Sequence, residues 1–412
     1  MRELMNTPRK IKAAALAALL CTAPALAACG GSSSGSGDAA SGGGDPIKIM
    51  VYGPFDAKGF SLPGAKTGPE AAVKKVNDAG GINGRKLELI ACNDDNDPNK
   101  AAGCARQAVE EKVVAAVGGL TQFEAQVVPV LEKAGIPVVG AVPLSNFTST
   151  SYFPLTGGGA GSFFGLAKAL VDNPKCEKKV GVLIEDFAAT QGAAQLFELG
   201  VASSGGTPTG VSKAPQGARD FAPAAEAATA KAQCIAFFSG PQTAPQIVTA
   251  LNQTGKVVAM GSSDTILQPA VTALGAEADG VVTATNFLPG TDESPANKEF
   301  VERATAIDPK FQSDQISAAG YAGVLILQKV LEGVDDITPA TVTAAVSKLK
   351  GYDTGLGPVV DFTTPNPTKS FSRLPVSSPM FELAAKDGKF YRTGDTTIDI
   401  SSIYQAVSQA GQ

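Results

Sequence analysis

Short apolar runs alternate with helical patterns along most of this chain. Residues 113–117 read VVAAV, an unbroken apolar run typical of a parallel strand that is covered on both faces. Two glycines then allow a sharp turn, and Val127, Val128 and Leu131 share one face of the helix that follows. Residues 136–139 resume as a strand, so this segment predicts one βαβ unit.

The loop of residues 118–122 is a first candidate for ligand binding. It lies at the carboxyl end of a predicted strand, and Thr121 or Gln122 is expected to cap the next helix. The first amides of a helix lack partners, and together with the helix dipole they favour an anion by roughly 0.3–1 kcal/mol when exposed. A small carboxylate would fit there, and ordinary helix capping without a ligand is the alternative.

The same alternation continues to the C-terminus and predicts an α/β fold with two doubly wound sheets. Strands are expected at residues 47–52, 86–92, 113–117, 136–139, 180–184, 235–238 and 257–260, and residues 281–288 are expected to lead back across the space between the two sheets. Helices are expected at residues 69–77, 99–112, 162–171, 193–201, 246–253, 297–305, 317–333 and 339–350. A hairpin at residues 381–391 is predicted to turn at Asp387 and Gly388, and the tail beyond Thr397 to be loosely held.

The N-terminal residues predict export and a lipid anchor. Basic residues precede an apolar stretch, residues 13–21, that is too short to span a bilayer as a folded helix. The sequence LAAC then ends at Cys29, and small residues before a cysteine are what bacterial lipoprotein processing requires. We therefore expect a signal peptide at residues 1–28, a lipidated Cys29 and a flexible Gly/Ser linker at residues 29–45. Ordinary secretory cleavage is the alternative.

The cysteines beyond Cys29 are even in number, which fits disulfides in an oxidising compartment. We favour Cys92 with Cys104, because a separation of 12 residues closes a local loop between a strand end and the next helix. Cys176 and Cys234 each precede an apolar strand, so the starts of those strands are candidates for neighbours.

Composition restricts the possible chemistry. The 412 residues include neither histidine nor tryptophan, which excludes Ser-His-Asp and Cys-His catalysis and zinc sites that use imidazole. Ser-x-x-Lys and Gly-x-Ser-x-Gly motifs are also missing. We therefore expect no enzyme, no metal and no cofactor. A net charge of -5 argues against a nucleic-acid partner, and the length favours two domains.

A run of motifs in the first half resembles a known family. After the first predicted strand come a GPF loop, VNDAGGINGRKLEL at residues 76–89, DDNDP at residues 94–98, GGLT at residues 118–121 and GIPVV at residues 135–139. This order is similar to that of periplasmic leucine-, isoleucine- and valine-binding proteins, the solute receptors of ABC importers, over roughly residues 46–390. The resemblance implies the type I periplasmic binding protein fold, with two doubly wound parallel-sheet lobes joined by three crossovers.

In the first lobe, the predicted ligand contacts lie in loops that follow strands. They are Phe55, Lys58 and Phe60 after the first strand, Thr121 and Gln122 after the third, and Ala141, Pro143 and Ser145 after the fourth. Near the last three, the family carries two small residues and a threonine that take the ligand's carboxylate and ammonium. This chain departs from that pattern.

In the second lobe, the resemblance implies contacts at Thr190, Gln242 and Asp264. Thr190 and Gln242 stand where the family has tyrosines that touch the ligand, and Asp264 stands where it has an acid for the α-ammonium group. The replacement of both aromatic side chains indicates a more polar or longer ligand than a branched-chain amino acid.

These features predict a membrane-anchored, extracytoplasmic solute-binding lipoprotein of an ABC importer. We expect a monomer that delivers an amino acid or a similar small carboxylate to a membrane permease. The first lobe is predicted to comprise residues 46–155 and 288–354, and the second lobe residues 156–287 and 355–412. The alternative is a lipoprotein sensor that reports the ligand to a partner receptor without transport; a surface hydrolase is disfavoured by the missing histidine.

Overall fold

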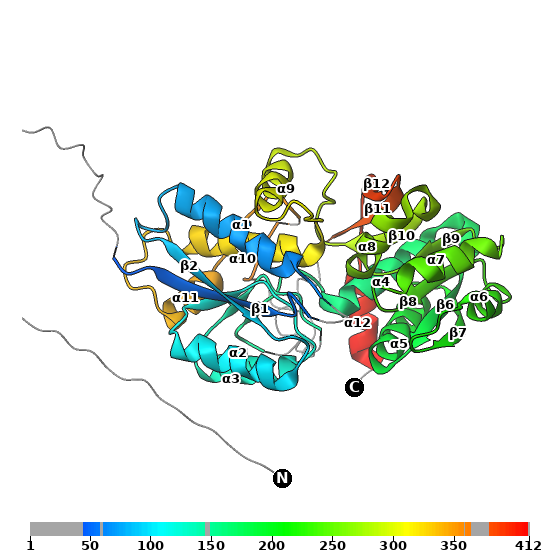
Figure 1. Ribbon diagram of the computed structural model, residues 1–412, viewed down its shortest axis with the longest axis horizontal. Helices are drawn as coiled ribbons and strands as arrows, with labels where there is room; N and C mark the ends of the chain where they lie inside the picture. Colours follow the sequence, from blue (N-terminus) through cyan, green and yellow to red (C-terminus); the bar gives the residue numbers. More distant parts are fainter. Residues whose placement is uncertain (1–43, 58–60, 145–148, 358, 364–378, 411–412) are drawn as a thin grey trace, which may run out of the picture. The chain divides into compact units, whose positions relative to one another are not determined.

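The computed structural model of this chain describes residues 44–57, 61–144, 149–357, 359–363 and 379–410. Within these ranges the strands form two sheets, and Figure 1 shows helices packed on both faces of each sheet. Cover on both faces explains why the strands read as continuous apolar runs. The predicted α/β fold of two lobes with parallel sheets is confirmed.

The sheet of the first lobe is parallel in all its described strands, which run in the order β2-β1-β3-β4-β5. These strands are β1 (Ile47–Gly53), β2 (Leu87–Asn93), β3 (Ala115–Val117), β4 (Val138–Val139) and β5 (Tyr152–Phe153). Strand order reverses between β1 and β3, so their carboxyl ends form a topological switch point, where open α/β sheets bind ligands.

Two groups of helices cover this first sheet. One face carries α1 (Gly64–Asp78), α9 (Pro295–Ile307), α10 (Gln315–Leu331) and α11 (Pro339–Val346), and the other carries α2 (Pro98–Glu110) and α3 (Glu124–Lys133). Gly118 allows α10 to approach the end of β3, because a Cβ on Gly118 would lie 2.6 Å from the Cα of Gly320. This close packing helps to place the start of α10 near the carboxyl ends of the strands.

The sheet of the second lobe runs, in the described residues, in the order β12-β11-β10-β9-β8-β6-β7. Its strands are β6 (Lys179–Asp186), β7 (Thr207–Pro215), β8 (Cys234–Phe238), β9 (Ala259–Gly261), β10 (Val281–Thr285), β11 (Met380–Lys386) and β12 (Lys389–Ile398). The pairings from β7 to β10 are parallel, whereas β10, β11 and β12 pair antiparallel. The hydrophobic pattern does not predict β7, because this edge strand is mostly polar and only partly buried.

Helices cover both faces of the second sheet as well. One face carries α4 (Gly158–Asp172) and α5 (Ala188–Ser203), and the other carries α6 (Ala222–Thr229), α7 (Ala244–Gln253) and α8 (Asp264–Leu274). Short 3-10 turns at Pro174–Cys176 and Gly275–Ala278 connect to β6 and β10. Phe164 of α4 and Phe197 of α5 are fully buried in the interior of this lobe.

The predicted C-terminal hairpin is confirmed. Its two strands, β11 and β12, are joined by Asp387 and Gly388, with φ angles of 49° and 77°. Both angles are left-handed, as a two-residue hairpin turn with the favoured twist requires.

The expectation that the tail beyond Thr397 is loosely held is wrong for residues 398–406. After β12 the chain forms α12 (Ser401–Ala410), which Figure 1 shows beside α5. The side chains of Ile403 and Tyr404 are buried, and the Tyr404 hydroxyl donates a hydrogen bond of 2.7 Å to the carbonyl oxygen of Gly157. The apolar spacing of α12 therefore docks this helix onto the start of α4.

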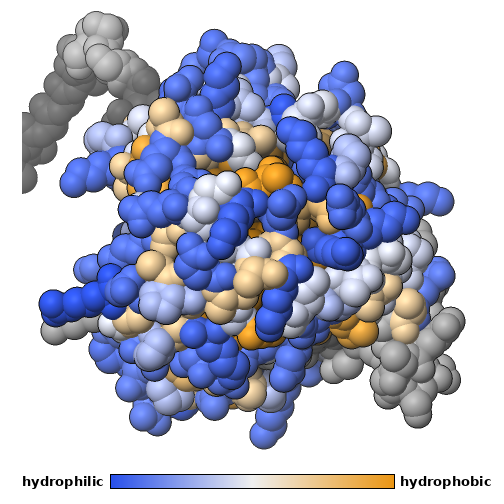
Figure 2. Space-filling view, turned by 90° about the vertical axis from the view of Figure 1, so that its right-hand side faces the viewer, coloured by the Kyte–Doolittle hydropathy of each residue, from blue (hydrophilic) through white to orange (hydrophobic). Residues whose placement is uncertain are grey.

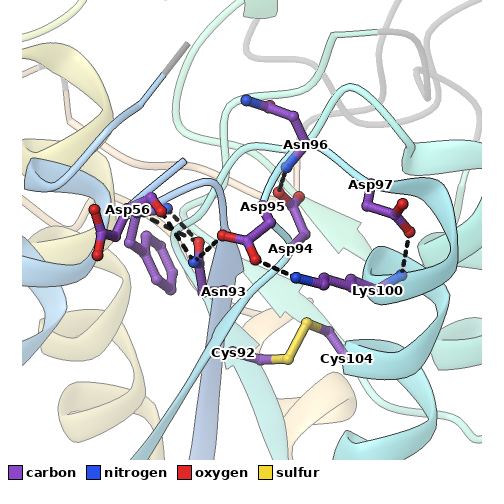
Figure 3. The surroundings of a disulfide bond; sticks show 10 residues. Asp56, Cys92, Asn93, Asp94, Asp95, Asn96, Asp97, Lys100 and Cys104 are labelled. Atoms are coloured by element: carbon purple, nitrogen blue, oxygen red, sulfur yellow. Dashed lines mark hydrogen bonds and ion pairs between the residues drawn. A yellow bond between two sulfur atoms is a disulfide. The ribbon is translucent and has the colours of Figure 1, made fainter. Parts of the chain in front are cut away.

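Disulfides join Cys92 to Cys104 and Cys176 to Cys234, so both predicted pairs are confirmed. The first pair joins the end of β2 to α2, as Figure 3 shows. The next residue, Asn93, accepts a hydrogen bond of 2.8 Å through Oδ1 from the backbone N–H of Phe55. The disulfide therefore sits beside the contact that holds the loop after β1.

The described chain passes between the lobes after β5, after β10 and before β11. Leu356 and Val360 pack in the core of the first lobe, together with α10 and α11. The residue boundaries expected for the two lobes stay predictions.

Candidate functional site

A cavity of about 800 Å³ lies at the carboxyl ends of strands from both sheets. The first lobe contributes Leu120 and Gln122 after β3, Val142 and Leu144 after β4, and Gln315 at the start of α10. The second lobe contributes the loops after β6, β7, β8 and β9, the start of α5 and one face of α4. Ligand sites in open α/β sheets lie at strand ends of this kind.

Three of the residues expected from the sequence line this cavity: Gln122, Thr190 and Gln242. Gln122 and Gln242 are exposed. The Thr190 hydroxyl is instead used inside the protein, because it donates to the carbonyl oxygens of Glu185 (2.5 Å) and Phe187 (2.8 Å). These bonds shape the turn from β6 into α5.

Other expected contacts in the first lobe are not among the residues that line the cavity. Phe55, Thr121, Ala141 and Pro143 are all buried, and none of them lines the cavity. The prediction that Thr121 or Gln122 caps the next helix is wrong, because α3 begins after Phe123. The Thr121 hydroxyl accepts a hydrogen bond of 3.2 Å from the N–H of Phe123, so it closes a turn one step before the helix. A direct role of these residues in binding stays a prediction.

Lys58, Phe60 and Ser145 lie outside the residues that the structure describes. Asp264 is the first residue of α8, immediately after Ser263, which lines the cavity. The structure describes the backbone of Asp264 but not its side chain, so its expected role also stays a prediction.

Glu185 is an ionisable residue of the cavity wall that the sequence prediction missed. It stands near the end of β6, and its side chain is only 5% exposed. Oε1 accepts the N–H of Gly217 at 2.8 Å, and Oε2 accepts the N–H of Gly240 at 3.2 Å and the Thr243 hydroxyl at 2.6 Å. One carboxylate thus organises the loops after β6, β7 and β8.

These hydrogen bonds keep Glu185 ionised. Burial alone raises the pKa of the Glu185 carboxyl, but the hydrogen bonds from Thr243, Gly217 and Gly240 outweigh burial and hold the pKa below its ordinary value of 4.5. The cavity wall therefore contains a negative charge at neutral pH. An acid that directly follows a buried apolar run at a strand end is the sequence signal that could have identified it.

Glu124 has a comparable position in the first lobe. It lies in the first turn of α3 and is 1% exposed, and its Oε1 accepts a hydrogen bond of 2.9 Å from the N–H of Leu144. Tyr152 lies beside it, and burial, followed by the nearby Tyr52 and Glu124, raises the pKa of Tyr152 well above its usual range. Glu124 therefore holds the loop whose Leu144 lines the cavity.

The rest of the described wall is a mixture of apolar and uncharged polar side chains. The larger apolar members are Leu120, Val142, Leu144, Phe163, Phe187 and Phe238, and the amides are Gln122, Gln216, Gln242 and Gln315. Phe163 and Phe238 meet edge to face, with ring centroids 5.1 Å apart. Among the described lining residues Glu185 is the only ionisable one. Such a wall suits a small ligand with an apolar body and a few polar groups.

Neither metal-binding clusters nor the exposed surface offers a stronger candidate site in the described residues. In the part of the chain that the structure describes, no cluster of Cys, Asp or Glu could hold a metal ion. Figure 2 shows the end of the molecule at the right of Figure 1, where hydrophilic side chains predominate and apolar ones appear in smaller areas among them. This face has the mixed character of an ordinary solvated surface, so the cavity is the stronger candidate.

Two doubly wound lobes that both line one cavity define the class of type I solute-binding proteins. The model of the periplasmic binding protein family matches residues 46–371, and the chain belongs to this family, as its motifs indicate. The family is one of extracytoplasmic substrate-binding proteins.

Relatives with assigned names agree with this membership. The chain is 24% identical over 349 residues to Leu/Ile/Val-binding protein homolog 3 of Brucella melitensis, covering 82% of this chain and 90% of that protein. It is also 24% identical over 316 residues to Leu/Ile/Val-binding protein BraC3 of Rhizobium johnstonii, covering 75% and 84%.

Solved structures show the same fold at lower identity. LivJ of Streptococcus pneumoniae, a branched-chain amino acid transporter substrate-binding protein in complex with isoleucine, has a TM-score of 0.69 at 18% identity, covering 86% of this chain and 99% of that one. An ABC transporter substrate-binding protein from Sphaerobacter thermophilus has a TM-score of 0.70 at 20% identity, covering 86% and 98%. Across the described residues, no helix is long and apolar enough to cross a membrane.

Proposed function

We propose that this protein is the solute-binding component of an ABC importer and that it binds a small amino acid in the cavity lined by both lobes. The observation that carries the proposal is the composition of the cavity wall. An ionised carboxylate, several amide and hydroxyl groups and an apolar surface share one space at the strand ends. The polar groups would orient the ligand, and burial of its apolar part would supply affinity.

The names of the relatives favour an amino acid with an aliphatic side chain over the more polar or longer ligand that Thr190 and Gln242 indicate in the sequence. One named relative is a Leu/Ile/Val-binding protein and the other is named as a homolog of one, and LivJ was solved with isoleucine. The apolar residues Leu120, Val142 and Leu144 support the same ligand class, since they offer an aliphatic surface to such a side chain. Lys58, Phe60, Ser145 and Asp264 remain proposed contacts beside Gln122 and Gln242.

We also propose that Cys29 carries a lipid and that residues 30–45 tether the folded lobes to the outer face of the cell membrane. The ligand would shift the lobes toward a closed form that a membrane permease recognises. The chain would act as a monomer in this cycle. Replacement of Cys29 with Ser should move the protein from the membrane fraction to the soluble fraction.

The direct test is a thermal-shift screen of the purified protein against amino acids, short amides, aromatic acids and small peptides. We expect leucine, isoleucine or valine to raise the melting temperature in a concentration-dependent way. Uptake of the labelled ligand into cells with and without the protein then separates transport from sensing. A screen in which no amino acid stabilises the protein would contradict the proposal.

A further inference from the structure

We propose that Glu185 binds the cationic end of the ligand, so that this site selects a primary ammonium group next to an apolar body. The inference rests on the proposed function and makes it more specific. It assigns the ammonium contact to the end of β6, whereas the sequence resemblance assigns it to Asp264. Three properties of Glu185 support it: its position, its missing counter-ion and its apolar neighbours.

The position of the carboxylate is fixed by its hydrogen bonds. Oε2 accepts two hydrogen bonds, from Gly240 and Thr243, whereas Oε1 accepts one, from Gly217. A carboxylate oxygen can accept two hydrogen bonds, so Oε1 retains capacity for one more donor. Glu185 lines the cavity although only 5% of its surface is exposed. An ammonium group in the cavity could therefore donate to a carboxylate that is already oriented.

The charge of Glu185 has no protein counter-ion in the described part of the chain. The described residues that line the cavity include no Lys or Arg, and no described ion pair includes Glu185. The adjacent Asp186 differs, because Lys213 lies 3.1 Å from its Oδ1 and Gln191 donates to the same oxygen. A buried carboxylate without a counter-ion is stabilised when a cationic ligand group approaches it. An anionic ligand group would be repelled from the same place.

The surroundings of Glu185 supply the apolar half of the proposed ligand site. Phe163 and Phe187 both line the cavity and are half-buried, so parts of their rings remain open to a ligand. Aromatic faces attract ammonium groups and also bury aliphatic groups. The ligand class that fits is a primary amine with a branched or aromatic apolar body.

The test compares ligands that share one carbon skeleton. Leucine carries both charged groups, 4-methylpentanoic acid lacks the ammonium group, and 3-methylbutylamine lacks the carboxylate. Their affinities are measured by calorimetry for the wild type, E185Q, D186N and D264N. E185Q removes the charge with little change of shape, and D186N removes the same charge one residue along, at a side chain outside the described cavity wall.

We expect the wild type and D186N to bind leucine about 10- to 100-fold more tightly than 4-methylpentanoic acid. In E185Q this ratio of affinities should fall to within about threefold. Leucine loses the attraction of its ammonium group to the carboxylate, and 4-methylpentanoic acid no longer meets a negative charge. If Glu185 had a purely structural role, E185Q would weaken the binding of both ligands together and leave the ratio of their affinities unchanged. Thermal unfolding of each variant checks that it is folded.

Three outcomes would overturn the assignment. The first is a wild-type ratio in E185Q, the second is a ratio that is lost in D264N but kept in E185Q, and the third is a wild type that prefers 4-methylpentanoic acid. Each of these leaves amino acid or carboxylate binding intact and removes only the role of Glu185. Absence of binding by all three compounds, together with a negative amino acid screen, would remove the proposed function as well.

Discussion

The hydroxyl of Thr243 donates a hydrogen bond of 2.6 Å to Oε2 of Glu185, across 58 positions of the sequence. This bond joins the end of β6 to the start of α7, directly at the cavity wall. Gly217 and Gly240 donate to the same carboxylate, so Glu185 links the three loops that follow the adjacent strands β6, β7 and β8. One charged side chain therefore connects much of the cavity wall of the second lobe.

Replacement of Thr243 with Val should reduce the free energy of unfolding by roughly 1.5–3 kcal/mol, because it removes a hydrogen bond to an ionised, buried carboxylate. Denaturation by urea measures this change. Thr249 provides a matched control, since its hydroxyl donates to Glu277 Oε1 at the same distance of 2.6 Å but in an exposed pair. T249V should cost less than about 0.5 kcal/mol. Equal effects of the two variants would contradict the importance of the Glu185 cluster.

The stability that Glu185 contributes should depend on pH. Its pKa in the folded protein lies below the ordinary value of 4.5, so the folded state holds the ionised form more tightly than the unfolded chain does. This stabilisation is complete above about pH 4.5 and is lost as the pH falls through the pKa of the folded state. E185Q should therefore be less stable than the wild type at neutral pH, and the difference should narrow in acid.

Glu198 on α5 provides a control of opposite sign. Burial raises the pKa of the Glu198 carboxyl, so the folded state disfavours its ionised form. E198Q should stabilise the protein at neutral pH, and this advantage should disappear as the carboxyl becomes protonated at lower pH. Unfolding curves at several pH values check both variants. Parallel pH profiles for E185Q and the wild type would show that Glu185 has no special environment.

The fold was predictable where local chemistry decides the structure. The turn at Asp387 and Gly388 needs left-handed backbone angles, and that pair of residues is itself the signal. The pairing of Cys92 with Cys104 was predictable because a short loop limits where a strand end and a helix can meet. Burial of α12 was missed, because its partner Gly157 lies 247 positions earlier in the chain.

The candidate site was less predictable for the same reason. The strand-end position identified Gln122, and the family resemblance identified Thr190 and Gln242, as residues that line one cavity. Thr121 lies in the right loop, but its hydroxyl closes a local turn and the side chain is buried. The part played by Glu185 arises from partners 32, 55 and 58 positions away, and such contacts leave no pattern in the local sequence.

The two disulfides should differ in their contribution to stability. In the chain-entropy model, closing a loop of 12 residues stabilises by about 3 kcal/mol and closing one of 58 by about 4 kcal/mol. The double variant C176A/C234A should therefore lower the stability more than C92A/C104A does. Denaturation curves of both variants, with intact mass to confirm the remaining disulfide, make the comparison. The reverse order would show that native packing around the sulfurs outweighs loop entropy.

Docking of α12 should contribute to the stability of the second lobe. Y404A removes a ring that is fully buried and the hydrogen bond to Gly157, and it should cost roughly 3 kcal/mol or more. Tyr391 in β12 is the matched control, because its side chain is 43% exposed and Y391A should have a small effect. Limited proteolysis should also cleave Y404A near its C-terminus earlier than the wild type. Equal unfolding and cleavage of the two variants would mean that α12 is not held in solution.

The most direct measurement of the central claim is calorimetric titration of isoleucine into two variants of α5. Ala189 lines the cavity and Ala202 is exposed on the same helix, so A189F places a phenyl ring at the cavity wall while A202F adds the same side chain elsewhere. We predict that the wild type and A202F bind isoleucine with similar affinity and that A189F binds it at least about tenfold more weakly, a loss of about 1.4 kcal/mol. Undiminished binding by A189F would place the ligand outside this cavity and contradict the account.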